Sequence, residues 1–232
     1  MSLLLSLLAC NPDPGYPASD VGYRPGLEDG PQSGERGSVK ITEVLWSGSV
    51  DDDGNFDPKD VFVELRNEST VQVDLSGWLI FETGAIQRAF QIPTTDKRLD
   101  VGEHVFIAAK DSGCFPDPDW VIPKLEFARG GDGFELTLRD FDERLIEPIG
   151  DDAMPAFAGG YDGKRSRSME RVELMFGGEG SAPNGWHFYT DARVEVPNND
   201  RIAENCRRST KASPGRANSP DYSGAFASGS LE

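Results

Sequence analysis

The stretch from Asp60 to Phe81, DVFVELRNESTVQVDLSGWLIF, constrains the fold most, because its apolar residues recur at every second position. Two sets of residues show this period: Val61, Val63 and Leu65, then Val71, Val73 and Leu75. A period of two is that of a strand with one face toward a core. The polar break that begins at Asn67 predicts a hairpin, in which the Asn67 side chain bonds its own backbone.

The end of this stretch predicts a core strand. Ser76-Gly77 turns the chain into Trp78-Leu79-Ile80-Phe81, an apolar run typical of a central buried strand. Gly77 permits a backbone angle that residues with a Cβ avoid. Trp78 is expected in the core, where its indole N–H needs a partner.

The remaining sequence repeats this scheme of short strands separated by turns. In the first strand Val39, Ile41 and Glu43 are expected on one face, with Lys40, Thr42 and Val44 on the other. Further strands are predicted within residues 88–93, 100–110, 130–140, 143–151 and 165–176. With 26 Gly, 16 Pro and no heptad repeat, the pattern predicts an all-β sandwich with long loops.

Charge limits the partners. The formal net charge is -17, which opposes binding to nucleic acid phosphates and to anionic lipid. Two basic clusters, Lys164-Arg165-Arg167 and Arg207-Arg208-Lys211, could form a local anion patch. Salt bridges to the acidic surface are the plainer interpretation of both.

The N-terminus MSLLLSLLAC has a short apolar run and a small residue before Cys10, as in a secretory signal over residues 1–10. Its end resembles the lipobox of bacterial lipoproteins, which implies lipid on Cys10 and attachment to a bacterial cell-envelope membrane. No Lys or Arg precedes the run, and a plain apolar tail is the alternative. Residues 11–37, rich in Pro, Gly and acidic side chains, predict a flexible tether, and residues 220–232 a disordered tail.

The other two cysteines are Cys114 and Cys206. An even pair in an exported chain indicates a disulfide. Such a bond would close a loop of about 90 residues and contribute about 4 kcal/mol in the chain-entropy model. Two free, partly buried thiols are the alternative.

Several motifs in order resemble the lamin-tail domain. They are Ile41-Thr42-Glu43-Val44, Phe62 through Asn67, Val73 through Trp78, Leu99 through Ala108, Gly133 through Ile149, Ser168-Met169-Glu170-Arg171, Trp186 and Ser213 through Asn218. The resemblance implies an immunoglobulin-like β-sandwich over residues 38–219, with insertions at Asp51 to Asp60 and Phe188 to Arg208. Structural roles are expected for Glu64, Asn67, Gly77, Trp78, Arg171 and Trp186, including an internal pair between Arg171 and Glu64.

The insertion DDDGNFDPKD carries clustered oxygen ligands at Asp51, Asp53, Asn55, Asp57 and Asp60. Its DxDGxxD order resembles short calcium loops, so Ca²⁺ is the one cofactor that the sequence indicates. The loop is not an EF-hand, because its twelfth residue is Phe62 rather than Glu. An acidic solvated turn is the alternative.

Catalysis is not predicted. The two histidines, His104 and His187, lie in no metal-ligand spacing, and the sequence has no GxSxG or Walker loop. We therefore expect a non-catalytic lipoprotein of the bacterial envelope, whose loops bind an envelope or extracellular protein or glycan. A calcium-dependent adhesive module and an accessory subunit of an exported hydrolase or nuclease system are the alternatives.

Overall fold

The computed structural model describes residues 36–129, 132–172, 180–190 and 199–220, and these fall within one compact unit that begins at Gly34. Cys10 and nearly all of the predicted tether lie outside the described residues, as does the chain from residue 221 onward. Within the described residues, no helix is long and apolar enough to cross a membrane.

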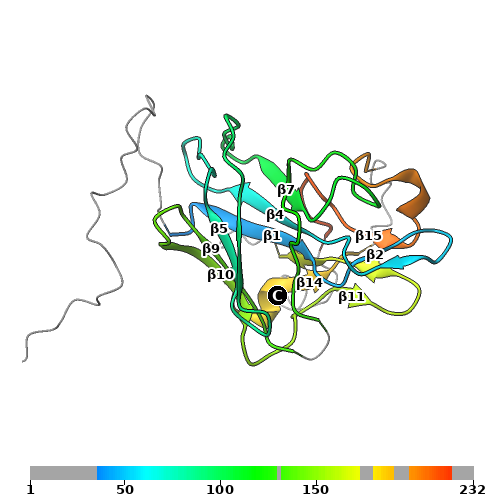
Figure 1. Ribbon diagram of the computed structural model, residues 1–232. Coiled ribbons are helices and arrows are strands. Elements are labelled where there is room, and N and C mark those ends of the chain that lie inside the picture. The colour runs from blue at the N-terminus through cyan, green and yellow to red at the C-terminus, as the bar shows by residue number, and fades with distance from the viewer. Residues whose placement is uncertain (1–35, 130–131, 173–179, 191–198, 221–232) are drawn as a thin grey trace, which may run out of the picture. The chain divides into compact units, whose positions relative to one another are not determined.

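The larger sheet has six strands in the order β14-β13-β1-β4-β7-β8 (Figure 1). The strands are β1 Val39–Leu45, β4 Phe62–Asn67, β7 His104–Ala108, β8 Trp120–Val121, β13 Met169–Arg171 and β14 Trp186–Phe188. Neighbours pair antiparallel, except that β8 runs parallel to β7.

The second sheet has four antiparallel strands in the order β10-β9-β5-β6. They are β5 Leu79–Glu82, β6 Arg88–Gln91, β9 Phe134–Arg139 and β10 Leu145–Asp151. Val63 and Val105 of the first sheet and Ile80 and Leu136 of the second share one buried core. The two sheets therefore pack face to face, and the predicted all-β sandwich is confirmed.

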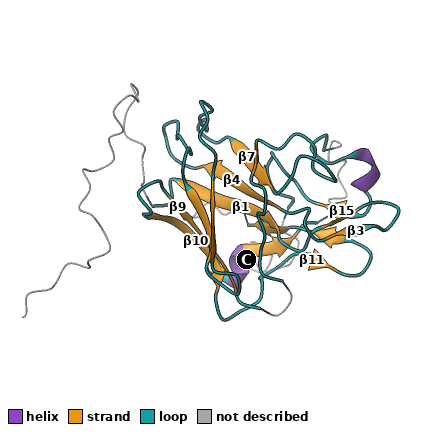
Figure 2. Ribbon diagram, in the orientation of Figure 1, coloured by secondary structure: helices purple, strands orange, loops and turns teal. Residues whose placement is uncertain are grey.

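Smaller elements surround the sandwich. A three-stranded sheet joins β11 Gly160–Tyr161, β12 Ser166–Arg167 and β15 Thr210–Lys211, and a hairpin joins β2 Ser49–Val50 and β3 Phe56–Asp57. The helical structure described is two 3-10 turns, Pro183–Gly185 and Glu204–Cys206, drawn in purple in Figure 2.

A β-bulge in β1 corrects the predicted faces of that strand. Ile41 pairs with Leu65 and Glu43 with Glu64, so Thr42 is the extra residue. The bulge shifts the alternation by one position. Val44 therefore joins Val39 and Ile41 in the main core, and the prediction that Glu43 shares their face is wrong.

The predicted hairpin after β4 is also wrong. Residues 71–75 form no regular strand, and their one β-bridge joins Val73 to Leu99. Val73 and Leu75 are still buried, whereas Val71 is 53% exposed. In the sheet, β4 pairs with β1 and β7, so both of its edges are occupied by other strands. The alternating apolar pattern therefore predicted the burial of Val73 and Leu75, although no regular strand forms there.

The turn residues behave largely as expected. The Asn67 amide donates to Val71 O and Leu99 O at 2.8 and 2.9 Å, and its oxygen accepts from Ser69 N. Gly77 has a φ of 79°, in the region that favours glycine. Trp78 is fully buried, but its Nε1 has no hydrogen-bond partner among the described residues, contrary to the expectation.

A second buried core lies on the other face of the six-stranded sheet. Phe62, Phe106 and Phe115 pack there in edge-to-face pairs, and Ile202 and Cys206 cover them. Cys206 is disulfide-bonded to Cys114, with a Cα–Cα distance of 5.6 Å and a sequence separation of 92. The predicted disulfide is confirmed, and the insertion that begins at Phe188 supplies the covering residues.

Candidate functional site

A row of buried polar side chains crosses the second face of the six-stranded sheet. The neighbouring strands β14, β13, β1 and β4 contribute, in that order, His187, Glu170, Glu43 and Glu64, and each of these residues is the cross-strand partner of the next. All four residues are at most 4% exposed. Three glutamates side by side in a protein interior are costly, because burial and mutual repulsion both oppose ionisation.

The C-terminal segment Ser213 to Ser219, called here the strap, supplies donors to the three carboxylates. Ser213 N donates to Glu43 Oε1 at 2.8 Å, and Gly215 N donates to Glu64 Oε2 at 2.7 Å. Ser219 N donates to Glu170 Oε2 at 3.1 Å. Each buried glutamate thus accepts a hydrogen bond from a backbone N–H of the strap. The carboxylates gain donors and the N–H groups of the strap gain acceptors.

Asn218 completes the strap at the bulge of β1. Its side-chain amide donates to Thr42 O at 2.9 Å and to Arg171 O at 2.8 Å. Thr42 is the bulged residue, where the ladder between β1 and β4 is interrupted. Asn218 therefore provides a hydrogen-bond donor to the strand backbone at the bulge.

Both histidines of the chain lie at this row. His104 Nδ1 is 2.8 Å from Glu64 Oε1, which also accepts from Thr42 Oγ1 at 2.7 Å. His187 Nε2 is 3.9 Å from Glu170 Oε2. Their side chains are 12% and 2% exposed, so each imidazole faces a buried carboxylate rather than solvent.

Burial dominates the electrostatics of the row. Burial raises the pKa of Glu43 well above its usual range, and the nearby carboxylates of Glu170 and Glu64 raise it further. Burial also raises the pKa of Glu170, against the opposing effect of hydrogen bonds from Ser213 and Ser219. The surroundings of the row therefore favour the protonated forms of Glu43 and Glu170.

Arg171 lies beside the row but binds a different carboxylate from the one expected. Its guanidinium pairs with Glu147 of β10, and both side chains are less than 10% exposed. The Trp186 ring lies 5.7 Å from the guanidinium carbon, and Trp186 Nε1 donates to Gly180 O at 2.8 Å. The predicted pair between Arg171 and Glu64 is wrong, because Arg171 links the two sheets instead.

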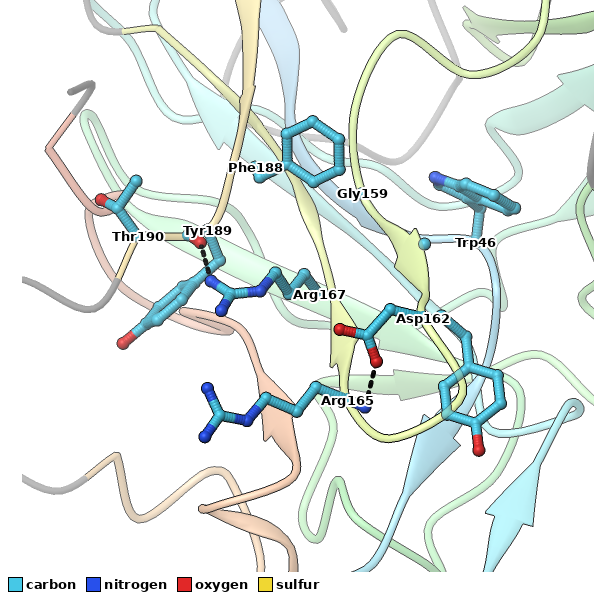
Figure 3. A pocket seen from close by; sticks show the side chains of 10 residues that line it. Trp46, Gly159, Asp162, Arg165, Arg167, Phe188, Tyr189 and Thr190 are labelled. Carbon is cyan, nitrogen blue, oxygen red and sulfur yellow. Dashed lines mark hydrogen bonds between the residues drawn. The ribbon is translucent and has the colours of Figure 1, made fainter. Parts of the chain in front are cut away.

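A pocket of about 510 Å³ lies on the sheet formed by β11 and β12 (Figure 3). Its aromatic lining residues are Trp46, Tyr161, Phe188 and Tyr189. Its charged lining residues are Asp162, Arg165 and Arg167, and Gly159, Gly160 and Thr190 complete the wall. The volume lies in the range of small-molecule sites, which combine apolar surface with a few polar groups.

The aromatic side chains of this aromatic–arginine pocket are held by their neighbours. Trp46 Nε1 donates to Ala158 O at 2.8 Å, which orients the indole. A Cβ on Gly160 would lie 3.3 Å from the Trp46 ring, so glycine lets the strand pass close to it. Tyr161 stacks on Phe56 with ring centroids 4.2 Å apart. Phe188 is 52% exposed.

The acidic loop before β4 forms a hydrogen-bonded turn. Asp51 Oδ1 accepts from Asp53 N and Asn55 N at 3.0 and 2.8 Å. Asp57 pairs with Lys110 at 2.5 Å. Asp60 Oδ2 accepts from Ser49 Oγ at 2.6 Å and from Cys114 N at 2.8 Å.

The contacts of the acidic loop are hydrogen bonds and ion pairs within the protein, and the calcium site stays a prediction. Across the described residues, no group of three or more His, Cys, Asp and Glu side chains is arranged to hold a metal ion. The loop contacts two neighbouring parts of the fold. Asp60 accepts a hydrogen bond from the backbone of Cys114, at the disulfide, and Phe56 stacks on Tyr161 of the pocket. Asp52 of the same loop pairs with Arg208 at 3.0 Å. This ion pair agrees with the expectation that the basic cluster Arg207-Arg208-Lys211 forms salt bridges to acidic side chains.

The sequence motifs locate the buried row better than the pocket. Glu43, Glu64, Glu170 and the Ser213 to Asn218 segment each belong to a different lamin-tail-like motif, and the fold brings them together. Of the pocket, the sequence had indicated the basic cluster that contains Arg165 and Arg167. Trp46, Tyr161 and Phe188 were missed, because an isolated aromatic residue in a loop or at a strand end gives no periodic signal.

No protein-family model matches the chain, and no curated protein sequence matches it. The lamin-tail resemblance therefore stays a prediction that rests on the order of the motifs and on their convergence at one place in an all-β sandwich.

Proposed function

We propose that this chain is a non-catalytic binding module of the bacterial cell envelope, of lamin-tail type, with the aromatic–arginine pocket as its ligand site. The observation that carries the proposal is the pocket itself, which is lined by an exposed aromatic residue, Phe188, and by the two arginines Arg165 and Arg167. Exposed aromatic and arginine side chains are the residue types enriched at binding surfaces.

The proposed display at the cell surface rests on two further features. Cys10 follows an apolar run in a lipobox-like context, and residues 11–37 provide a tether. The disulfide between Cys114 and Cys206 is of the kind found in exported proteins. Lipid on Cys10 would hold the pocket near the envelope despite the net charge of -17.

A non-catalytic role is supported by the surroundings of the groups suited to acid–base chemistry. His104 and His187 both face buried glutamates beneath the strap. The backbone N–H groups of the strap occupy oxygens of the same glutamates. The contacts of this cluster thus fasten the strap to the sheet, which is a structural task.

The binding role is tested by retention on isolated cell envelopes of the bacterium that carries the gene. We expect the purified chain to sediment with the envelopes and Phe188→Ser to lose most of that retention. Val101→Ser is the matched control, because Val101 is 58% exposed and does not line the pocket. Equal retention of all three proteins would show that the pocket is not the binding site.

Membrane display has a separate test. Cells that express the full chain are labelled with an alkyne fatty acid, and we expect label on the wild type and none on Cys10→Ser. An unlabelled wild-type protein would remove the lipoprotein part of the proposal and leave the binding part standing.

A further inference from the structure

The hairpin of β11 and β12 is a local exception to the acidic character of the chain. Between Gly160 and Arg167 there are three basic side chains, Lys164, Arg165 and Arg167, against one carboxylate, Asp162. The chain as a whole has 40 acidic and 23 basic residues. Two of the three cations line the pocket. The pocket is therefore a positive site on a protein that otherwise repels anions.

The one carboxylate of the pocket is engaged in the turn. Asp162 Oδ1 accepts from Lys164 N at 2.9 Å and from Arg165 N at 2.7 Å. These backbone bonds lower the pKa of Asp162, and the nearby charges of Arg167 and Arg165 lower it further, so Asp162 is ionised beside the two arginines. One carboxylate against two guanidinium groups leaves the lining with a net positive charge.

The two arginines differ in how they are held. Arg167 is half-buried and donates from Nη1 to Tyr189 O at 2.9 Å, which orients its guanidinium within the pocket (Figure 3). A guanidinium has five N–H donors, so one such bond leaves the group able to bind an anion. Arg165 is exposed and extends from the same hairpin. Arginine binds carboxylates through paired, parallel hydrogen bonds.

Next to this cationic side the pocket offers rings and hydroxyls. Trp46 and Phe188 provide apolar ring surface, and Tyr161 and Tyr189 are lining residues with a phenol hydroxyl, whereas the Thr190 hydroxyl donates to Pro220 O. A pyranose ring presents C–H groups that pack on an aromatic face and hydroxyls at its edge that form hydrogen bonds. An acidic peptide has carboxylates but few hydroxyls, so it matches only part of this lining.

We propose that the aromatic–arginine pocket binds an acidic saccharide, a sugar unit with a carboxylate, such as a uronic acid. The carboxylate binds Arg165 and Arg167, and the sugar ring lies against Trp46 and Phe188. This inference rests on the proposed function, because it names the ligand class of the same pocket. The net charge of -17 then disfavours anions that do not reach the two arginines.

Titration calorimetry of the full chain with a panel of oligosaccharides tests the inference. The panel holds oligomers of galacturonate, guluronate, mannuronate, glucuronate and sialic acid, each beside its uncharged methyl ester. We expect at least one acidic oligomer to bind about tenfold or more tightly than its ester, since charge-assisted hydrogen bonds are lost in the ester. Binding should weaken as salt is raised.

Arg165→Gln should reduce the affinity for that oligomer about tenfold and leave the melting temperature unchanged, because Arg165 is exposed. Arg144→Gln is the matched control, an exposed arginine of the β9–β10 connection that does not line the pocket. An unchanged affinity in Arg165→Gln would overturn the assignment of Arg165.

The remaining outcomes separate this inference from the proposed function. Equal binding of acid and ester, or binding of poly-glutamate in place of every saccharide, overturns the acidic saccharide and leaves a binding module. Envelope retention that depends on Phe188 without any saccharide binding does the same. Loss of both retention and saccharide binding overturns both proposals.

Discussion

Glu43 and Glu170 are direct cross-strand partners of β1 and β13, and both carboxyl groups contact the hydroxyl of Ser213. The Ser213 oxygen is 3.2 Å from Glu43 Oε2 and within hydrogen-bonding distance of Glu170 Oε1. A serine hydroxyl has one proton and can donate to only one of them. Burial raises the pKa of Glu43 well above its usual range, and the neighbouring carboxyl groups of Glu170 and Glu64 raise it further, so the site favours the protonated form of Glu43.

The first prediction concerns stability against pH. Because burial raises the pKa of Glu43 in the folded chain above that in the unfolded chain, the folded chain binds more protons. This contribution to stability is fully present below the usual glutamate range and is lost as the pH rises through the raised pKa. Stability measured by urea denaturation should therefore fall from acidic toward alkaline pH over this window.

Glu43→Gln should flatten that profile, because an amide keeps the shape and an acceptor for Ser213 N without a charge to bury. At pH 8 we expect the variant to be more stable by on the order of 1 kcal/mol, or about 2–4 °C in Tm. A smaller fall should remain from Glu170, whose pKa burial also raises. Glu143→Gln, at an exposed turn, is the control, and a Glu43→Gln profile parallel to the wild type would contradict the assignment.

The second prediction concerns the strap. Asn218→Ala removes the amide that donates to Thr42 O and Arg171 O. Leaving two partly buried carbonyls without this partner should lower the free energy of unfolding by about 1–3 kcal/mol. Hydrogen exchange should then quicken at Gly215 N and Ser219 N, which the glutamates hold. Asn205→Ala, at an exposed site, is the control. Unchanged exchange at both amides would show that Asn218 does not hold the strap on the sheet.

The third prediction concerns the link between the sheets. Arg171 of β13 and Glu147 of β10 form a buried pair, so Arg171→Met leaves an unpaired buried carboxylate and should cost about 3–5 kcal/mol. The double variant Arg171→Met/Glu147→Met should be more stable than the single one, because no charge remains buried. A double-mutant cycle by urea denaturation measures the coupling, and additive effects would show that the pair is not coupled.

The alternating runs allowed the strands of the sandwich to be predicted, since a strand with one buried face carries its pattern locally. β4, β7, β9 and β10 lie within the predicted segments. Residues 71–75 show the limit of this reasoning. They alternate as a strand does, yet both edges of β4 are already paired, and edge occupancy depends on the whole topology.

The buried row shows a second limit. The motif around Glu43 was visible, but its face was assigned wrongly because one bulged residue, Thr42, inverts every later side chain. The partner of Arg171 was missed for a related reason. Glu147 comes from the opposite sheet, and strand periodicity gives no information on which side chains meet across a core.

The fourth prediction concerns the disulfide. Cys114–Cys206 fastens the segment that covers Phe62 and Phe106 on the second face of the large sheet, just ahead of the strap. Removing the bond in Cys114→Ala/Cys206→Ala should lower the free energy of unfolding by about 4 kcal/mol, since a long loop is released in the unfolded chain. Reductant should lower the Tm of the wild type and leave the double variant unchanged. Cys10→Ser is the matched control and should melt like the wild type under both conditions, because Cys10 is not part of the bond. If the oxidised and reduced wild type melt together, the bond does not stabilise this fold, and the second core must hold its covering segment by packing alone.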